Sequence, residues 1–251
     1  MKGHIIAGAF FLAATTLASA ADLKAPVKET PKPFDWSGAY AGVHLGYGWG
    51  KSDYTDNEYN GFPPAFPTVN WAVDTKGLFG GLQAGYNWQR GSAVFGIEGE
   101  LGYLGLKGSA MQPGFDPFGV PYDAFGEFDR GWYGGLGGRL GYAMNRTLIY
   151  AKGGAVYSDA KVRFIDNCTA APCGNGSIDA SKKVGWGYQI GGGVEHAVTD
   201  DWTIKAEYAY LDFGRKTITG VGLTGMSTGI TYNIGADLSV HTVRIGVNRR
   251  F

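Results

Sequence analysis

The last eleven residues of the chain, His241 to Phe251, read HTVRIGVNRRF. Apolar side chains occupy alternate positions from Val243 to Val247, and the stretch ends on an aromatic residue. Successive side chains of a β-strand point to opposite faces, so this alternation predicts a strand with one apolar and one polar face. Arg244 lies on the polar face, where it needs a partner or water.

Seven stretches upstream alternate in the same way, which predicts eight antiparallel strands. Short polar turns join three of the successive pairs, near residues 89–91, 144–146 and 199–201. The other four connections are longer than loops of compact soluble domains usually are. The seven stretches cover residues 37–50, 78–88, 93–103, 132–142, 149–157, 184–195 and 202–210, and Val184 and Trp186 are expected on the same apolar face.

The two faces of these strands differ in an unusual way. One face is apolar and rich in aromatic residues, and the other carries charged residues and many of the 43 glycines. A soluble sheet has no need of so much glycine on its polar surface, whereas an eight-stranded barrel has an interior that side chains alone can fill. The sequence therefore predicts an all-β fold, an eight-stranded antiparallel transmembrane β-barrel with four long extracellular loops and short periplasmic turns, over residues 36–251.

The aromatic residues support this interpretation. If the first strand starts on the periplasmic side, the outward aromatic side chains fall at the two ends of the strands, as expected of the girdles of an outer-membrane barrel. The outer girdle is predicted to contain Trp49, Tyr103, Trp132, Tyr157, Trp186 and Tyr210, and the inner girdle Trp88, Tyr142, Trp202 and Phe251.

Charged residues recur on the inward face of the predicted strands. Because unpaired charge in a narrow lumen is costly, acids and bases are expected to pair there. The favoured interpretation is a structural charge network that fills the lumen; the alternative is a gate whose rearrangement passes small ions. A catalytic role is not expected, because no substrate cleft reaches a filled lumen, and the protein is predicted not to be an enzyme. The network is predicted to contain Glu98, Glu100, Glu195 and Glu207 with Arg139, Lys152, Lys205 and Arg244.

The N-terminal region resembles an export signal. Lys2 and His4 precede an apolar run, and Ala18-Ser19-Ala20 supplies small residues for cleavage, so residues 1–20 are predicted to be a signal peptide. Residues 21–35 are rich in Pro and Lys and are predicted to form a flexible periplasmic segment. No later stretch is apolar over the roughly 20 residues that a spanning helix needs.

Other signals are weak or exclude functions. Lys and Arg number 22, as do Asp and Glu, which gives no electrostatic case for nucleic acid. Cys168 and Cys173 are close together in a predicted loop and are expected to form a disulfide in the oxidising periplasm. Metal binding would need more ligands than this pair, and no metal or cofactor is expected.

Aromatic residues also gather in the first two long connections. Two interpretations remain open: they pack between loops or continue the barrel above the membrane, or they form an exposed binding surface. They are Tyr54, Tyr59, Phe62, Phe66 and Trp71 in the first connection, and Phe115, Phe118, Tyr122, Phe125 and Phe128 in the second.

The strand sequences resemble a known family. FDWSGAYAGVHLGYGWG, GGLQAGYNWQ, VFGIEGELGY, GWYGGLGGRLGYAMNRTLIYAKGGAVY, GWGYQIGGGVEHAVTDDWTIKAEYAYLDFG and HTVRIGVNRRF are similar, in order and spacing, to small outer-membrane β-barrel proteins of alphaproteobacteria. These are known as porin-family or outer-membrane immunogenic proteins and have an OmpA-like eight-stranded barrel. The resemblance covers nearly all the strands but not the long loops.

The resemblance implies a location in the Gram-negative outer membrane, with lipid and the barrel-assembly machinery as partners. It also implies that Phe251 is part of the signal that this machinery reads. The expected function is structural, a surface-exposed barrel that contributes to envelope integrity. The alternatives are a narrow ion or small-solute pore, or binding of haemin or host molecules through the loops, for which no ligand residues can be assigned.

Overall fold

The structure is a computed structural model, and it describes residues 34–59, 68–115, 119–167, 178–222, 229 and 231–251. No helix in these ranges is long and apolar enough to span a membrane. The described residues form a single antiparallel sheet of ten strands. The strands are β1 (Gly38–Tyr59), β2 (Val69–Arg90), β3 (Ala93–Leu104), β4 (Gly108–Met111), β5 (Ala124–Asp129), β6 (Gly131–Met144), β7 (Thr147–Asp166), β8 (Ile178–Ala197), β9 (Trp202–Val221) and β10 (Thr231–Arg250).

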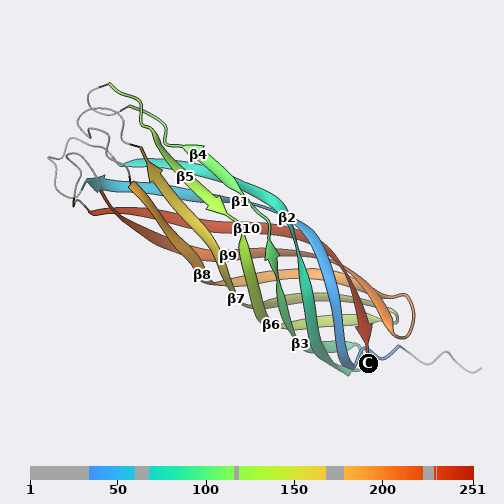
Figure 1. Cartoon of the computed structure of the whole chain (residues 1–251). Coiled ribbons are helices and arrows are strands. Elements are labelled where there is room, and N and C mark those ends of the chain that lie inside the picture. The colour runs from blue at the N-terminus through green and yellow to red at the C-terminus, as the bar shows by residue number, and fades with distance from the viewer. Residues whose placement is uncertain (1–33, 60–67, 116–118, 168–177, 223–228, 230) are drawn as a thin grey trace, which may run out of the picture. The chain divides into compact units, whose positions relative to one another are not determined.

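Eight of the strands close into a ring, which confirms the predicted barrel (Figure 1). The C-terminal strand β10 completes it, because it pairs with β9 on one side and with β1 on the other. The short strands β4 and β5 continue the wall beyond the ends of β3 and β6. There β5 pairs with the far part of β7, and Lys107 bridges to Lys76 of β2.

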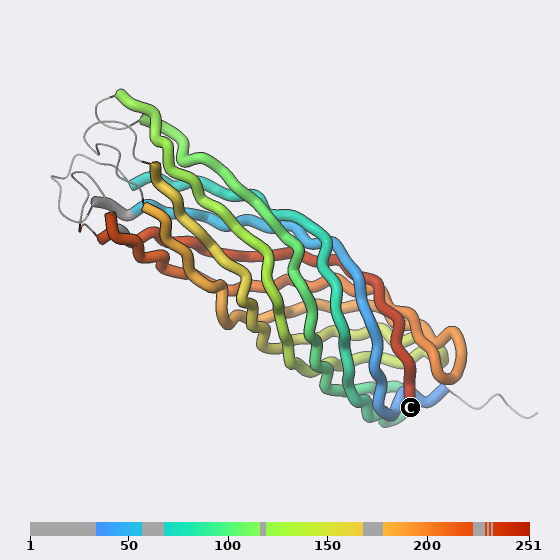
Figure 2. The backbone as a smooth tube through the Cα atoms, in the orientation of Figure 1, coloured from blue at the N-terminus to red at the C-terminus, as the bar shows by residue number. Residues whose placement is uncertain are grey.

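The three predicted short turns lie together at one end of the barrel with the C-terminus (Figure 2). They connect β2 to β3, β6 to β7, and β8 to β9. In the second turn Asn145 has a φ of 54°, a left-handed conformation that asparagine tolerates better than most residues. Short turns are typical of the periplasmic end of an outer-membrane barrel, so this end of the barrel is assigned to the periplasm.

The outward face over the turn-proximal half of the barrel is apolar, as predicted. Ile245 is 68 % exposed and Leu136 is 67 % exposed, values that a water-soluble sheet would not tolerate over a continuous surface. Aromatic rings contact one another at both ends of this surface. At the outer end Trp49 stacks on His241 at 5.9 Å and Tyr157 meets Trp186 at 5.3 Å between ring centroids, and at the inner end Trp88 stacks on Phe95 at 6.0 Å.

Beyond the outer girdle the two faces of the strands exchange their character. In β10, Leu238 is 2 % exposed and Ile234 is 2 % exposed inside the barrel, while Asp237 and Ser239 point outward. The far half is therefore an apolar-cored barrel of the kind found in water. Its buried side chains include Tyr54, Trp71, Val73, Leu104, Leu106, Phe128, Val156, Val162, Phe164, Ile178, Leu211, Phe213 and Ile218.

This exchange corrects the prediction for the long connections. Six strands contain 20 to 22 residues, about twice the 9–11 that cross a membrane. Much of what was expected to be extracellular loop is strand that extends beyond the bilayer. The alternation does not stop at the girdle; the outward positions become polar, which looks like the end of a strand when only the apolar face is followed.

One facing prediction is wrong for a local reason. Val184 is fully buried inside the barrel, although it was expected on the same face as Trp186. The pairing of β7 with β8 shifts register between Ser158 and Lys161, and Gly185 has a φ of +75°. A β-bulge of this kind adds one residue and reverses the facing on either side of it. A second register shift with a left-handed glycine, Gly214, occurs in β9.

The apolar core of the far half makes a specific prediction. Leu238→Ala should lower the free energy of unfolding by about 2–5 kcal/mol, because it leaves a cavity among buried side chains. The outward neighbour substitution Ser239→Ala should change it by less than about 0.5 kcal/mol. Urea unfolding of both variants in lipid vesicles measures the difference. Equal effects would mean that the far half has no packed interior.

Candidate functional site: the filled lumen

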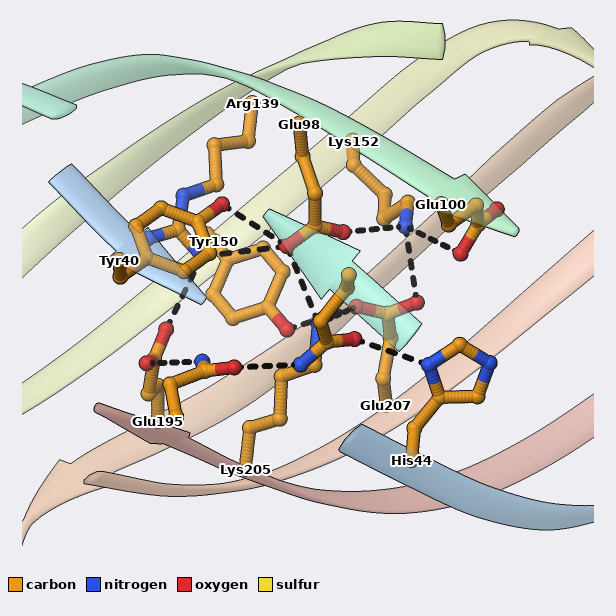
Figure 3. A network of polar contacts seen from close by, with 12 residues as sticks. Tyr40, His44, Glu98, Glu100, Arg139, Tyr150, Lys152, Glu195, Lys205 and Glu207 are labelled. Carbon is orange, nitrogen blue, oxygen red and sulfur yellow. Dashed lines mark hydrogen bonds and ion pairs between the residues drawn. The ribbon is translucent and has the colours of Figure 1, made fainter. Parts of the chain in front are cut away.

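Eight charged side chains from six strands meet inside the membrane-spanning half of the barrel. Figure 3 labels all of them except Arg244. None is more than 8 % exposed. They are the eight residues expected on the inward face: Glu98 and Glu100 of β3, Arg139 of β6, Lys152 of β7, Glu195 of β8, Lys205 and Glu207 of β9, and Arg244 of β10.

Lys152 lies at the centre of this network. Its Nζ donates a hydrogen bond to Glu98 Oε1 at 2.8 Å. The same ammonium is 3.2 Å from Glu207 Oε1 and 3.7 Å from Glu100 Oε2. One cation thus bridges carboxylates from β3 and β9, strands on different parts of the ring.

Arg244, the polar-face residue of the C-terminal stretch, completes the same cluster. Its Nη1 donates to Glu100 Oε2 at 2.5 Å, and its Nε donates to Glu207 Oε1 at 2.8 Å. A further hydrogen bond joins its Nη2 to the same oxygen of Glu207. Lys205 Nζ donates to Glu98 Oε2 at 3.1 Å. Every carboxylate here has a cationic partner, as buried charge requires.

Arg139 connects the cluster to the periplasmic side of the lumen. Its Nη1 donates to Glu195 Oε2 at 2.9 Å and its Nε to Asn87 Oδ1 at 2.8 Å. Among the described residues its Nη2 has no hydrogen-bond partner. The guanidinium carbon is, however, 4.4 Å from the Tyr40 ring centroid and 5.3 Å from that of Tyr150, so two aromatic faces contact the cation.

Neutral side chains add further hydrogen bonds to these carboxylates. Tyr40 donates to Glu98 Oε2 at 2.9 Å, and Tyr150 donates to Glu207 Oε2 at 2.7 Å. Both tyrosines have inward parity in the sequence, so their position was predictable. Their bonding to particular carboxylates was not, because the partners are more than 50 residues away along the chain.

A second polar chain runs beside the charged cluster. His44 Nε2 is 2.6 Å from the Tyr133 hydroxyl, and His44 Nδ1 is 3.1 Å from Gln83 Oε1. Gln83 then donates to Asn248 at 2.6 Å, and Asn248 donates to Glu195 at 2.8 Å. This chain of contacts links β1 and β2 to β10 and β8 through side chains alone.

The inward glycines make room for these large side chains. A Cβ at Gly85 would lie 2.4 Å from the Tyr40 hydroxyl oxygen, and a Cβ at Gly96 would lie 2.4 Å from Asn87 Oδ1. Neither distance is compatible with van der Waals contact. The high glycine content on the inward face therefore allows the lumen to hold arginine, lysine and tyrosine together.

The periplasmic mouth is closed by the segment that precedes β1. Trp36 is 1 % exposed, its backbone N donates to Gln89 Oε1 at 2.7 Å, and its indole N donates to the Asn145 carbonyl at 3.1 Å. The Arg250 guanidinium lies 4.5 Å from the ring centroid of Phe34. Phe34 was assigned to the flexible segment, but it packs here in an apolar cluster with Val94, Ala143, Leu148 and Ala197.

Comparison with known proteins now identifies the architecture. The model of a family described as outer membrane protein beta-barrel domain matches residues 9–251. The chain belongs to this family. It is an outer-membrane β-barrel protein of a Gram-negative cell, and the interior just described is the lumen of its barrel.

Relatives with similar sequences are also outer-membrane proteins. The chain is 30 % identical to the 31 kDa outer-membrane immunogenic protein of Brucella melitensis, with all of both chains covered. It is 37 % identical to a 22 kDa outer membrane protein of Rhizobium leguminosarum over 57 % of this chain and 56 % of that one.

Two solved barrels are similar in fold. They are the outer membrane protein OprG of Pseudomonas aeruginosa (TM-score 0.51, 13 % identity, 86 % of this chain and 96 % of that one) and the protease OmpT of Escherichia coli (TM-score 0.51, 9 % identity, 89 % and 99 %). At such low identity the likeness to OmpT carries the fold and not the proteolytic activity.

The remaining predicted features have mixed outcomes. Cys168, Cys173 and the signal region of residues 1–20 lie outside the described residues, so they stay predictions. Phe251 is 73 % exposed at the end of β10, and its backbone N donates to the Ala39 carbonyl at 2.9 Å. No group of three or more potential metal ligands occurs within the described ranges.

Of the two interpretations of the aromatic residues in the long connections, the structure favours the one in which they continue the barrel above the membrane. Tyr54, Trp71 and Phe128 are buried inside the far half of the barrel, and Tyr54 donates to the Glu127 carbonyl at 2.6 Å. Phe115 is 64 % exposed. Phe62, Phe66, Phe118 and the side chain of Tyr59 lie outside the described residues, and Tyr122 and Phe125 are partly exposed.

The charge network predicts a large effect of single-charge removal. Arg244→Met should destabilise the folded barrel by about 3–5 kcal/mol, because Glu100 and Glu207 lose a buried cation. Arg130→Met removes an outward arginine that is 48 % exposed and should cost less than about 1 kcal/mol. Unfolding free energies in vesicles test this. An Arg244→Met barrel as stable as wild type would show that the network does not hold the lumen together.

Proposed function

We propose that this protein is a closed structural barrel of the outer membrane that carries a rigid extension beyond the bilayer. The supporting observation is that side chains fill the barrel at three successive levels. These are the Trp36 cluster at the periplasmic mouth, the charge network within the membrane, and the apolar core beyond it.

The charge network argues against the alternative of a narrow pore. A path for ions would require Lys152, Arg244 and their carboxylates to separate inside a low-dielectric barrel. Breaking a buried ion pair without a replacement partner costs about 3–5 kcal/mol, and several pairs share each carboxylate here. Tyr40 and Tyr150 would also have to give up their hydrogen bonds to Glu98 and Glu207.

The extension beyond the bilayer suggests what the protein contributes to the envelope. An apolar-cored barrel of paired strands extends the wall well beyond the lipid surface as a stiff structure. Surface exposure fits the relatives in Brucella, which are named immunogenic proteins. Binding of haemin or host molecules would then depend on the connecting segments rather than on the barrel.

Conductance measurements test the closed-barrel proposal. Wild-type protein, refolded and verified by heat-modifiable gel mobility, should give no stable current steps in planar bilayers. Outward-face substitution Leu136→Ala is a suitable control for reconstitution, because it alters lipid contact without touching the lumen. Reproducible single-channel steps from the folded wild type would contradict the closed-barrel proposal and show that the protein is a pore.

We also propose that Phe251 contributes to recognition by the barrel-assembly machinery. Phe251→Ala should reduce the amount of folded protein in the outer membrane several-fold while leaving the refolded barrel stable in vitro, because its exposed ring fills no interior space. Cell fractionation and heat-modifiable mobility measure both quantities. Normal outer-membrane levels of the variant would show that Phe251 is not needed for recognition by the barrel-assembly machinery.

A further inference from the structure

A row of lysines crosses the outer surface of the barrel just beyond the outer aromatic girdle. Lys76 of β2 pairs directly with Lys107, the residue before β4, and Lys161 of β7 pairs directly with Lys183 of β8. Between the two pairs, β5 places Asp129 opposite Lys161. All four lysines are exposed and lie on neighbouring strands of the same wall.

Such pairing is unfavourable without an additional partner. Directly opposite residues of an antiparallel pair have Cβ atoms about 4.5–5.5 Å apart, and like charges in this arrangement are destabilising. The two lysine pairs therefore concentrate positive charge on this surface without stabilising the sheet. A bound anion would turn this cost into an attraction.

The outward arginines of the same region are different, because each has a carboxylate partner. Arg163 donates to Asp179 Oδ1 at 2.7 Å, a contact that lowers the pKa of that carboxyl, and Arg215 is 3.8 Å from Asp237. Asp129 is 3.7 Å from Arg130. Within the described part of the chain, none of the four lysines has a carboxylate at ion-pair distance.

The height of the row matches the headgroup layer of the outer leaflet. Lys107 and Lys161 follow the girdle residues Tyr103 and Tyr157 by four positions, and Lys183 precedes Trp186 by three. Three or four residues correspond to about 10–13 Å along a strand, or about 7–9 Å along the membrane normal for a strand tilted by roughly 45°. Lysine side chains can bend toward the interface across that distance.

We propose that the lysine pairs Lys76–Lys107 and Lys161–Lys183 bind the phosphate headgroup of an anionic lipid in the outer leaflet, whose acyl chains lie on the apolar wall below. Pocket-like hollows of that wall fit this role. One is lined largely by Leu101, Trp132, Leu136, Tyr157 and Trp186, beneath the row. Asp159 also lines it, and its Oδ1 accepts a hydrogen bond from the Trp132 backbone N at 2.6 Å. The lipid would neutralise the lysines and hold the extension at a defined height.

Native mass spectrometry of the full barrel in a neutral detergent tests the proposal with dioleoyl phosphatidic acid as the probe. The variant K76Q/K107Q/K161Q/K183Q removes the row. The variant R130Q/R163Q/R215Q is the control, because it removes ion-paired cations from the same outward surface. Wild type and control should bind phosphatidic acid at least about tenfold more tightly than phosphatidylcholine, and the lysine variant should lose this preference.

Two further measurements distinguish lipid binding at the lysine row from misfolding of the variant and from binding of free phosphate. Without lipid, the lysine variant should melt at the same temperature as wild type or higher, because it relieves like-charge contacts, so lost binding cannot be attributed to misfolding. Inorganic phosphate at millimolar concentration should not displace the lipid. Retained preference in the lysine variant, equal loss in the arginine control, or displacement by inorganic phosphate would each overturn the proposal.

Discussion

The constraint on which this structure depends is that a chain crossing lipid must satisfy all its backbone hydrogen bonds within the protein. An open sheet leaves two edges unpaired, and no water reaches them in the bilayer. The pairing of β1 with β10 removes both edges along the whole length of the barrel, from Tyr40 opposite Arg250 to Tyr59 opposite Tyr232. In the closed barrel, each strand has one face toward the surroundings and one toward a narrow interior. The composition of the two faces follows from that division.

The interior resolves a conflict between charge and space. Four carboxylates and four cations can occupy a low-dielectric lumen only if each is paired and hydrogen-bonded. Arginine, lysine and tyrosine side chains are long, and an eight-stranded barrel is narrow. Glycine at positions such as Gly85 and Gly96 yields the volume that Tyr40 and Asn87 occupy. The glycine-rich and charged character of the inward face is thus a single solution, in which small residues make a dense polar interior possible.

The solvent outside the barrel changes along its length, and the sequence changes with it. In the bilayer the apolar residues face outward, and the interior is polar. Beyond the girdle water surrounds the wall, and the apolar residues move inside, as Leu238 and Asp237 show in adjacent positions. The bulges at Gly185 and Gly214 occur near this boundary, where β8 and β9 shift register against their neighbours. One continuous barrel therefore has an apolar outer face and a polar interior in the bilayer, and a polar outer face and an apolar interior beyond it.

The sequence by itself determined the eight-stranded ring, the lipid and lumen faces, the two girdles and the inward position of all eight charged residues. It could do so because the side-chain period of a strand is local and the lipid face is strongly apolar. Only the tertiary structure decided which carboxylate pairs with which cation, since Arg244 and Glu100 lie 144 residues apart. It also decided that the strands continue beyond the girdle and that Val184 faces inward. Closure, register and bulges bring distant residues together, and no local pattern encodes those distances.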